Sequence, residues 1–223
     1  MIVAAVPVKD LVNAKQRLMT ILTPVQRAEL ARAMLRDVLQ ALRQARLDAV
    51  WLVTRDTEAA AVAAEFGASI VGEDENRGHT AAVAHAQARA VTSGARVFVT
   101  VPGDVPCVRP EEIDALTAAA TAAAVAFTPS RSGHGTNGAA LTPPDVMALT
   151  FGEPSFENHL DTARRSHLEP RVLQQHGLSL DIDDPHDLQA LLAEASHTES
   201  GRLVARWAIA DRLRSAVSVT GQV

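Results

Sequence analysis

Cysteine and aromatic residues are scarce in this chain. Its 223 residues contain one cysteine, Cys107, and no tyrosine, and the aromatic fraction is 3%. A single cysteine cannot form an internal disulfide, which suits a reducing compartment. The few aromatic rings leave little surface on which single-stranded nucleic acid could stack. We therefore expect neither a disulfide-stabilised scaffold nor a protein that binds single strands.

An excess of positive charge is also missing. Lys and Arg total 21 and Asp and Glu total 26, so the formal net charge is −5 at pH 7. General binding to the phosphate backbone of nucleic acids requires a basic face. The composition therefore predicts no nucleic-acid partner, while a local basic pocket for a small anion stays open.

Long apolar runs are absent as well. The longest alanine-rich stretch, residues 116–127, is shorter than the ~20 apolar residues that a membrane-spanning helix needs. The apolar run at residues 2–8 is too short for the hydrophobic region of a signal peptide, and no basic residue precedes it. We expect no membrane partner and a cytoplasmic location.

Continuous apolar runs alternate with helical periodicity along the first part of the chain. The runs predict buried strands, and they lie at residues 2–8, 49–54, 68–72, 96–101 and 123–128. The longest helix is expected at 24–44, where Thr23, Pro24 and Gln26 form a capping-box pattern, and Asp56 is expected to cap the next helix. Such alternation is typical of βαβ chains. We predict the α/β fold class, with a mostly parallel mixed sheet flanked by helices.

The pattern is less regular after residue 128. A Gly/Ser-rich loop is expected at 129–138, and a second loop, FGEPSF, leads into a helix at Ser155. A last strand is predicted at 178–182, followed by a helix with Asp184 as its N-cap.

The end of the chain has the pattern of a helix. We predict a single domain over residues 1–196 and a helical tail over 197–223. The apolar side chains of the tail could pack on the domain or on a second copy of the chain, so a homodimer stays open.

Three cations follow the first predicted strand. They are Lys9, Lys15 and Arg17 in the segment PVKDLVNAKQRL. Ligands of open α/β sheets bind at the carboxyl ends of strands, where three cations can neutralise a triphosphate and stabilise the charge that develops as a phosphoanhydride breaks. The segment lacks the glycines and the GK[ST] ending of a Walker A loop. A solvated connector is the alternative, but the position favours nucleotide-phosphate binding.

Acidic side chains follow two other predicted strands. Asp104 lies between two prolines in PGDVP, and LDIDDP contains Asp181, Asp183 and Asp184. Magnesium binds through one or two carboxylates together with substrate phosphates. Carboxylates from two strand ends beside a basic loop match metal-assisted phosphoryl or nucleotidyl transfer. Strand alternation places Asp181 and Asp183 on one face, so either could bind the metal, and a turn or helix cap is the alternative for Asp104.

Two loops offer hydroxyl and backbone N–H groups. The segment 130–138, SRSGHGTNG, and the pair Gly152 and Ser155 at a helix N-terminus suit a phosphate or a carboxylate. A loop without a ligand is the alternative for each.

Cysteine and histidine are not predicted to be reactive. Cys107 is expected to be a small buried residue, because the sequence places no histidine to activate it. His79 and His85 lack the spacing of a zinc helix, and we expect the histidines to be structural or to lie on the surface.

Five segments together resemble a known family. In chain order they are PVKDLVNAKQRL, PGDVP, GTNG, FGEPSF and LDIDDPHDL, and the resemblance extends from residue 2 to about 195. They look like the 2-phospho-L-lactate guanylyltransferases, which make the guanylylated intermediate of the deazaflavin coenzyme F-420. Relatives of that family act on phosphoenolpyruvate or 3-phosphoglycerate. The resemblance implies a Rossmann-like fold of the nucleotide-diphospho-sugar transferase type, with GTP as donor and magnesium as cofactor.

The resemblance also implies roles for single residues. It implies that the catalytic residues are Lys9, Lys15 and Arg17, which hold the nucleotide phosphates, and Asp104. Asp104 and Asp183 would bind the metal. The phosphorylated three-carbon acid would be held by Thr136, Gly152 and Ser155. One segment departs from the family: where a Leu-Asn-x-Ala pattern is common, this chain has RGHTAA at 77–82, a segment expected to approach the nucleotide.

The predicted reaction is therefore guanylyl transfer. A phosphate oxygen of 2-phospho-L-lactate, 3-phospho-D-glycerate or phosphoenolpyruvate attacks the α-phosphorus of GTP, and pyrophosphate leaves. Two other functions stay open, namely a nucleotidyltransferase of the same fold that uses a sugar phosphate, and a non-catalytic nucleotide-binding regulatory module. The presence of both Asp104 and Asp183 favours an enzyme, because a protein that only binds could lose either one.

Overall fold

The apolar runs of the first half form the parallel part of one sheet. In the computed structural model, which describes residues 1–72 and 78–214, these strands are β1 (Ile2–Pro7), β2 (Ala49–Val53), β3 (Ser69–Val71) and β4 (Val97–Thr100). Each pairs in parallel with its neighbours in the order β3-β2-β1-β4. The sequence EDENRGH predicts a polar turn at 73–79, and its residues 73–77 lie outside the described residues, as do residues 215–223 at the end of the predicted tail.

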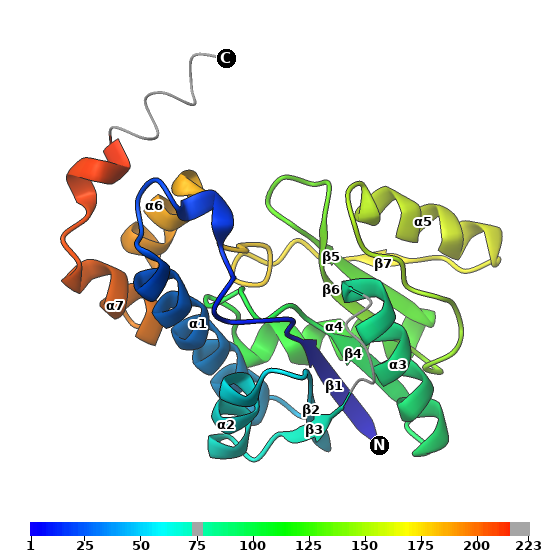
Figure 1. Ribbon diagram of the computed structural model, residues 1–223. Helices are drawn as coiled ribbons and strands as arrows, with labels where there is room; N and C mark the ends of the chain where they lie inside the picture. The colour runs from blue at the N-terminus through cyan, green and yellow to red at the C-terminus, as the bar shows by residue number, and fades with distance from the viewer. Residues whose placement is uncertain (73–77, 215–223) are drawn as a thin grey trace.

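The second half adds an antiparallel part. Strand β6 (Thr136–Leu141) pairs antiparallel with both β4 and β5 (Val125–Pro129), and β7 (Arg171–Val172) pairs in parallel with β5. Within the described residues the sheet has seven strands in the order β3-β2-β1-β4-β6-β5-β7. The predicted α/β class with a mostly parallel mixed sheet is confirmed (Figure 1).

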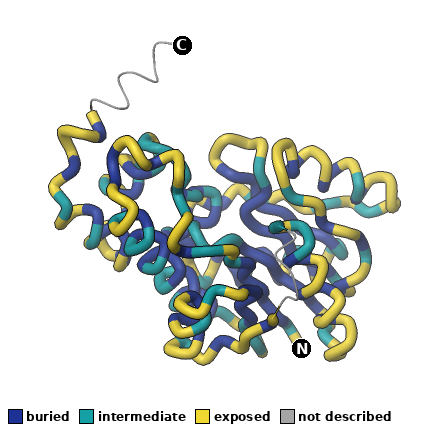
Figure 2. Tube along the Cα trace, viewed as in Figure 1, coloured by how far each residue is buried: buried dark blue, intermediate teal, exposed yellow. Residues whose placement is uncertain are grey.

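Helices cover both faces of the sheet. The helices α1 (Pro24–Gln44), α2 (Thr57–Glu65) and α4 (Pro110–Ala123) pack on one face, where their apolar side chains meet Ala4 and Val6 of β1. The helices α3 (His79–Thr92) and α5 (Ser155–Arg165) pack on the other face, against Val3 and Ala5. The alternation of β1 side chains therefore gives the sheet two buried faces, and Figure 2 shows the strands as the buried centre.

The predicted helix caps are confirmed at three helices. The Thr23 hydroxyl accepts a hydrogen bond from the Gln26 N–H at 3.2 Å, and the Gln26 side chain accepts one from the Thr23 N–H at 3.0 Å. Asp56 caps α2, and Asp184 caps α6 (Pro185–Glu194). These side chains bind helix N–H groups that have no partner within the helix, which explains why the chain changes direction at these residues.

A third apolar cluster joins the tail to the rest of the chain. It contains Leu18 and Ile182, which lie near the ends of two predicted site segments, and side chains of α6, α7 (Glu199–Arg206) and the residues that follow. The Asp37 carboxylate of α1 accepts hydrogen bonds from the Glu199 and Ser200 N–H groups at 2.7 and 2.9 Å. The described tail thus packs on its own chain, and the boundary expected after residue 196 stays a prediction.

Two predictions about the second half are wrong. Residues 178–182 are not a strand, because their backbone bonds to a local turn and to a distant loop. The N–H groups of Ser179 and Leu180 donate to the Gln175 and Gly177 carbonyls at 3.0 and 3.3 Å, and the Ile182 N–H donates to the Asp104 carbonyl at 3.1 Å. A Cβ on Gly177 would lie 2.0 Å from the Cys107 carbonyl oxygen, so the backbone approaches too closely for a ladder of side chains. The loop predicted at 129–138 is shorter, because residues 136–138 belong to β6. The structure contains, among its described residues, no helix long and apolar enough to span a bilayer.

Candidate functional site

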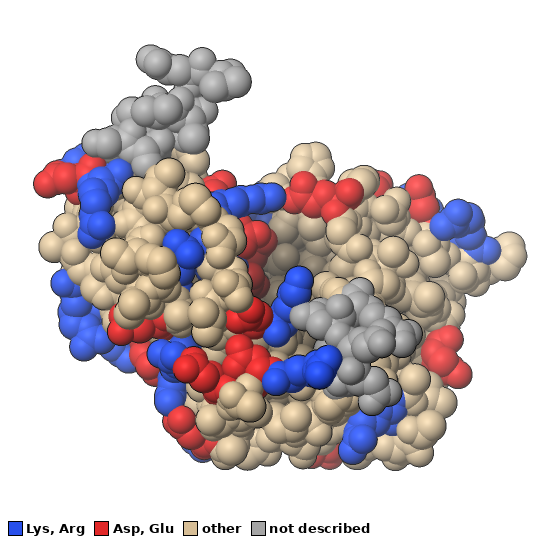
Figure 3. Space-filling view, in the orientation of Figure 1, with Lys and Arg blue, Asp and Glu red and all other residues tan. Residues whose placement is uncertain are grey.

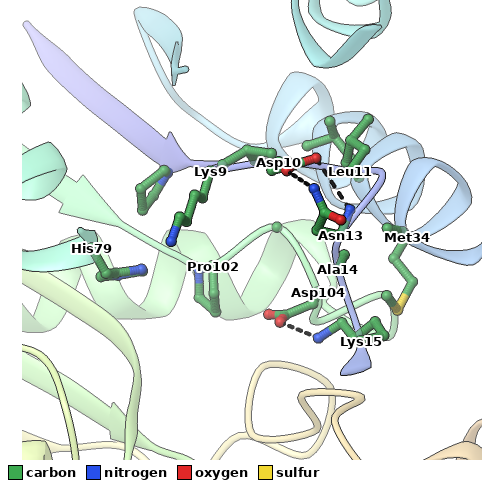
Figure 4. A pocket seen from close by; sticks show the side chains of 15 residues that line it. Lys9, Asp10, Leu11, Asn13, Ala14, Lys15, Met34, His79, Pro102 and Asp104 are labelled. Carbon is green, nitrogen blue, oxygen red and sulfur yellow. Dashed lines mark hydrogen bonds and ion pairs between the residues drawn. The ribbon is translucent and has the colours of Figure 1, made fainter. Parts of the chain in front are cut away.

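A cavity of about 480 Å³ lies at the carboxyl end of β1. The loop after β1 forms one side of it, with Lys9 and Lys15 among its lining residues, and Asp104 and His79 belong to other walls (Figure 4). Side chains of α1 close it with an apolar surface that includes Met34. The predicted strand-end residues of two separate segments therefore meet at one cavity, and Figure 3 shows basic and acidic side chains around a hollow on this face.

Lys15 joins the two predicted metal ligands. Its ammonium lies 2.5 Å from Asp104 Oδ2 and 2.8 Å from Asp183 Oδ1, and its side chain is 7% exposed. Burial alone would lower the pKa of Lys15, but the two carboxylates raise the pKa above its ordinary value. Burial by itself would raise the pKa of Asp183, yet the charges of Lys15 and Arg17 bring it below the ordinary value. Lys15 and Asp183 are therefore charged together at neutral pH.

The backbone at Lys15 is strained. Its φ of 57° and ψ of 43° lie in the left-handed region, which a residue with a side chain seldom adopts. Such a conformation persists only where the surrounding contacts favour it. The two ion pairs of the ammonium supply those contacts, and they hold the buried cation between Asp104, which follows β4, and Asp183.

One carboxylate oxygen at the site has no partner. Asp104 Oδ1 is buried and makes no hydrogen bond to any residue that the structure describes. A buried charged oxygen without a partner is costly, and a bound cation would remove that cost. The described residues contain no cluster of three acidic, cysteine or histidine ligands. Asp104 and Asp183 thus fit a hard divalent cation that takes its remaining ligands from phosphate and water.

The other predicted cations lie nearby without joining this cluster. The exposed Lys9 side chain extends toward His79 and Pro102 in the cavity (Figure 4). Arg17 is exposed on the short 3₁₀ helix Gln16–Leu18, where it does not line the cavity but acts on the charge of Asp183. The structure therefore brings Lys9, Lys15 and Asp104 together and leaves Arg17 at the margin.

Asp181 and Asp183 have different partners. The Asn137 side-chain amide donates to Asp181 Oδ1 at 2.9 Å, whereas Asp183 contacts Lys15. Burial raises the pKa of Asp181, and the charges of Asp104 and Asp183 act in the same direction. Of the two aspartates that the sequence left open, Asp183 is the one that shares a cation with Asp104.

Two acidic residues shape the basic loop, a role that the sequence did not predict for either of them. The Asp10 carboxylate accepts from the N–H groups of Val12 and Asn13 at 2.8 and 3.2 Å. Asp56 caps α2 with one oxygen and accepts from the Leu11 N–H at 2.8 Å with the other. An aspartate two residues before a turn is a common signal for such a hydrogen bond, whereas the contact from Asp56 depends on the fold.

The predicted acceptor residues lie together elsewhere. Ser155 Oγ accepts from the Thr136 N–H at 3.0 Å, and the two side chains are buried at 2% and 7% exposure. Gly152 is exposed, and its φ of 115° is accessible to glycine alone among common residues. None of the three lines the 480 Å³ cavity.

His159 hydrogen-bonds to one of the predicted acceptor residues, Thr136, and to the backbone of Thr150. Its Nε2 accepts from the Thr150 N–H at 2.9 Å, so Nε2 carries no proton, and Nδ1 lies 2.9 Å from Thr136 Oγ1. Nδ1 must therefore carry the proton of a neutral ring and donate it to the hydroxyl. Burial lowers the pKa of His159 to about 4, which keeps this tautomer at neutral pH.

The predictions for Cys107 and His79 agree with the structure in part. Cys107 is half-buried, and burial together with nearby acidic charges raises the pKa of its thiol to about 11, as expected for an unreactive cysteine. His79 was expected to be structural or superficial but lines the cavity. Burial lowers the pKa of His79 although the charge of Asp104 opposes the shift. Its place after the third strand was the signal in the sequence that could have identified it.

Comparison with known proteins places these features in a family. Residues 2–215 match the family described as "Guanylyl transferase CofC like". The chain is 41% identical to the phosphoenolpyruvate guanylyltransferase of Sphaerobacter thermophilus, over 89% of this chain and 98% of that protein. It is 32% identical to the 2-phospho-L-lactate guanylyltransferase of Methanothermobacter thermautotrophicus, over 88% and 86% of the two chains.

Solved structures agree on the fold. A protein of Desulfovibrio desulfuricans G20, provisionally named a nucleotide-diphospho-sugar transferase, superposes with a TM-score of 0.78 at 18% identity, over 96% of this chain and 97% of that one. The Rv0371c protein of Mycobacterium tuberculosis H37Rv, solved in complex with manganese, superposes with a TM-score of 0.58 at 21% identity, over 87% and 100%. The chain belongs to the CofC-like guanylyl transferase family and is a nucleotidyltransferase enzyme.

Proposed function

We propose that the enzyme transfers GMP from GTP to a phosphorylated three-carbon acid and releases pyrophosphate, as a step of coenzyme F-420 biosynthesis. The observation that carries the proposal is the cluster of Lys15, Asp104 and Asp183 beside the cavity. The names of the relatives support phosphoenolpyruvate and 2-phospho-L-lactate as acceptors, and 3-phospho-D-glycerate has the same phosphate and carboxylate groups.

Lys9, Lys15 and Arg17 hold the triphosphate in this proposal. Lys15 is already charged and sits between two carboxylates that would also hold magnesium. Its ammonium can exchange a carboxylate partner for a phosphate oxygen without leaving the site. Lys9 reaches the same cavity, and Arg17 adds positive charge at its margin.

Asp104 and Asp183 are the residues that would hold the magnesium ion. Their fit rests on the partnerless oxygen of Asp104 and on the short distance of both carboxylates to one cation. When bound, the ion supplies positive charge that stabilises the phosphate oxygens as the anhydride breaks. The manganese complex of a protein with the same fold is compatible with this assignment.

The chemistry needs no covalent intermediate on the protein. An anionic phosphate oxygen of the acceptor forms the new bond to the α-phosphorus, and the bond to the β-phosphate oxygen breaks as pyrophosphate takes the electron pair. The nucleophile carries its own negative charge, so no side chain has to remove a proton. The protein contributes position and electrostatic stabilisation.

A panel of substrates tests the proposal. The purified enzyme is incubated with magnesium, one of GTP, CTP, UTP or ATP, and one of the three phospho-acids or a sugar 1-phosphate, and pyrophosphate release is measured. We expect release with GTP and at least one phospho-acid, and loss of release when EDTA removes the divalent ion. Release with a sugar phosphate alone, or GTP binding without release for every acceptor, would contradict the proposal.

The remaining expectations concern the assembly. A cytoplasmic location and a homodimer were predicted from the sequence, and the described tail packs on its own chain. Light scattering at several concentrations measures the mass of the particle, and a mass twice that of the chain would support the homodimer.

A further inference from the structure

Thr80 fastens a distant loop to the wall of the cavity. It is the residue after His79, which lines the cavity at the start of α3. The Thr80 hydroxyl donates to the Phe151 carbonyl oxygen at 3.2 Å and accepts from the Phe151 N–H at 2.9 Å. One side chain thus satisfies both backbone groups of Phe151, at a separation of 71 residues in the sequence. This contact clamps Phe151 to the helix that carries His79.

The Phe151 ring connects two histidines. Its centroid lies 4.5 Å from the ring of His79 and 5.1 Å from the ring of His159, in tilted and edge-on geometries. Aromatic pairs at such distances and angles are attractive. Phe151 is therefore packed between the histidine of the cavity and the histidine that positions Thr136.

The loop beyond Phe151 leads to the proposed acceptor residues. Gly152 has a positive φ with open space around it, and residues 152–154 are exposed. Ser155 is buried at the start of α5 and hydrogen-bonds to Thr136. The exposed part of the loop is thus held at Phe151 on one side and at Ser155 on the other, and the contact at Phe151 comes from the nucleotide side.

We propose that Thr80 and Phe151 couple the nucleotide cavity to the acceptor loop, so that GTP against His79 stabilises the loop conformation that holds the phospho-acid. The identities of the two ligands rest on the proposed function. Thr80 is a positioning residue, since its hydroxyl contacts the loop backbone. Binding of GTP and of the acceptor is then linked, and each raises the affinity for the other by the same factor.

Steady-state kinetics of two Thr80 variants test the coupling. Thr80→Val keeps the shape of the side chain and removes the hydroxyl, and Thr80→Ser keeps the hydroxyl as the matched control. We expect Thr80→Val to raise the KM for phosphoenolpyruvate about tenfold, the size expected for lost hydrogen bonds of this kind. Because the linkage is reciprocal, the KM for GTP at saturating phosphoenolpyruvate should rise by a similar factor, while GTP alone binds with wild-type affinity. Thr80→Ser should restore both KM values. A rise in only one of the two KM values, or a serine variant as poor as the valine variant, would overturn the coupling.

Hydrogen exchange gives a measurement that does not need turnover. In the wild type, GTP should slow exchange of the backbone amides at residues 150–155. In Thr80→Val, calorimetry should show GTP binding with unchanged affinity, while the protection of 150–155 is lost. If no acceptor is turned over but this difference is found, the coupling stands and the proposed acceptor chemistry fails. If turnover is found and both proteins show the same protection, the coupling fails and the function stands. Absence of GTP binding to the wild type would overturn both.

Discussion

The regions proposed to bind the nucleotide and the acceptor, called here the nucleotide side and the acceptor side, are built in opposite ways. On the nucleotide side, Lys15 is a buried charge on a strained backbone, and Asp104 has an oxygen without a partner among the described residues. On the acceptor side, Thr136, Ser155 and His159 are buried, neutral and hydrogen-bonded to one another. Unsatisfied charge is expected where a ligand or metal ion is needed to complete the site, and a satisfied network is expected where a loop must keep one shape before the ligand binds.

If unsatisfied charge on the nucleotide side serves catalysis, the largest losses of activity should come from changes at Asp104 and Asp183. Asp104→Asn keeps the size of the side chain and removes the charge, and we expect kcat/KM to fall by about 10³-fold because transition-state charge loses its stabilisation. Asp183→Asn should have a similar effect, measured as pyrophosphate release. Asp181→Asn is the matched control, because Asp181 contacts Asn137 and not Lys15. A larger loss for Asp181→Asn than for Asp183→Asn would show that the wrong aspartate has been assigned.

Lys15 should show a smaller effect on activity and an opposite effect on metal binding. Lys15→Met removes the ammonium that both carboxylates share, and we expect kcat/KM to fall by about 10²-fold through weaker binding of the phosphates. Without GTP, the variant should bind Mn²⁺ more tightly than the wild type, because the competing charge is gone. Electron paramagnetic resonance of free Mn²⁺ measures this binding. Weaker Mn²⁺ binding in the variant would contradict the location of the metal between these carboxylates.

The acceptor side should respond to pH through His159. The pKa of His159 is about 4 in the folded protein and about 6.5 in an unfolded chain. Between these values the unfolded state binds more protons than the folded state. The free energy of unfolding therefore falls as the pH is lowered from 6.5 to 4. The loss from this group is about 3 kcal/mol. His159→Gln keeps an acceptor near Thr150 and does not titrate. Urea unfolding should therefore show a flatter pH dependence for the variant, and parallel curves would rule out a neutral buried imidazole.

Much of the parallel half, and the meeting of Lys15 with Asp104, could be predicted from the sequence. Local patterns determine them: apolar runs mark the strands, Thr23 and Asp56 mark helix starts, and Lys15 and Asp104 follow strands whose ends meet in this class of fold. The order of the motifs then indicated the family.

The antiparallel half depended on contacts that local patterns do not contain. Residues 178–182 look like a strand, but distant parts of the chain satisfy the backbone there. The Ile182 N–H donates to the Asp104 carbonyl, and the Ser179 carbonyl accepts from the Asn137 side-chain amide. Likewise, Thr80 and His159 are ordinary helix residues in the sequence, and only the folded chain brings them to Phe151 and Thr136. The sequence alone therefore predicted the charged side of the site better than the neutral one.

The smallest effect is expected at Gly152, on the acceptor side of the site. Gly152→Ala adds a methyl group in open space, but the φ of 115° disfavours any side chain, so we expect the free energy of unfolding to fall by about 1 kcal/mol. The strain is on the acceptor loop, so the KM for phosphoenolpyruvate should rise while the KM for GTP stays unchanged. Gly67→Ala is the matched control, since Gly67 also has a positive φ in open space but lies at the end of α2. If both variants lost stability and only Gly152→Ala changed the acceptor KM, the loop would bind the acceptor; if neither changed it, Gly152 would serve the turn alone.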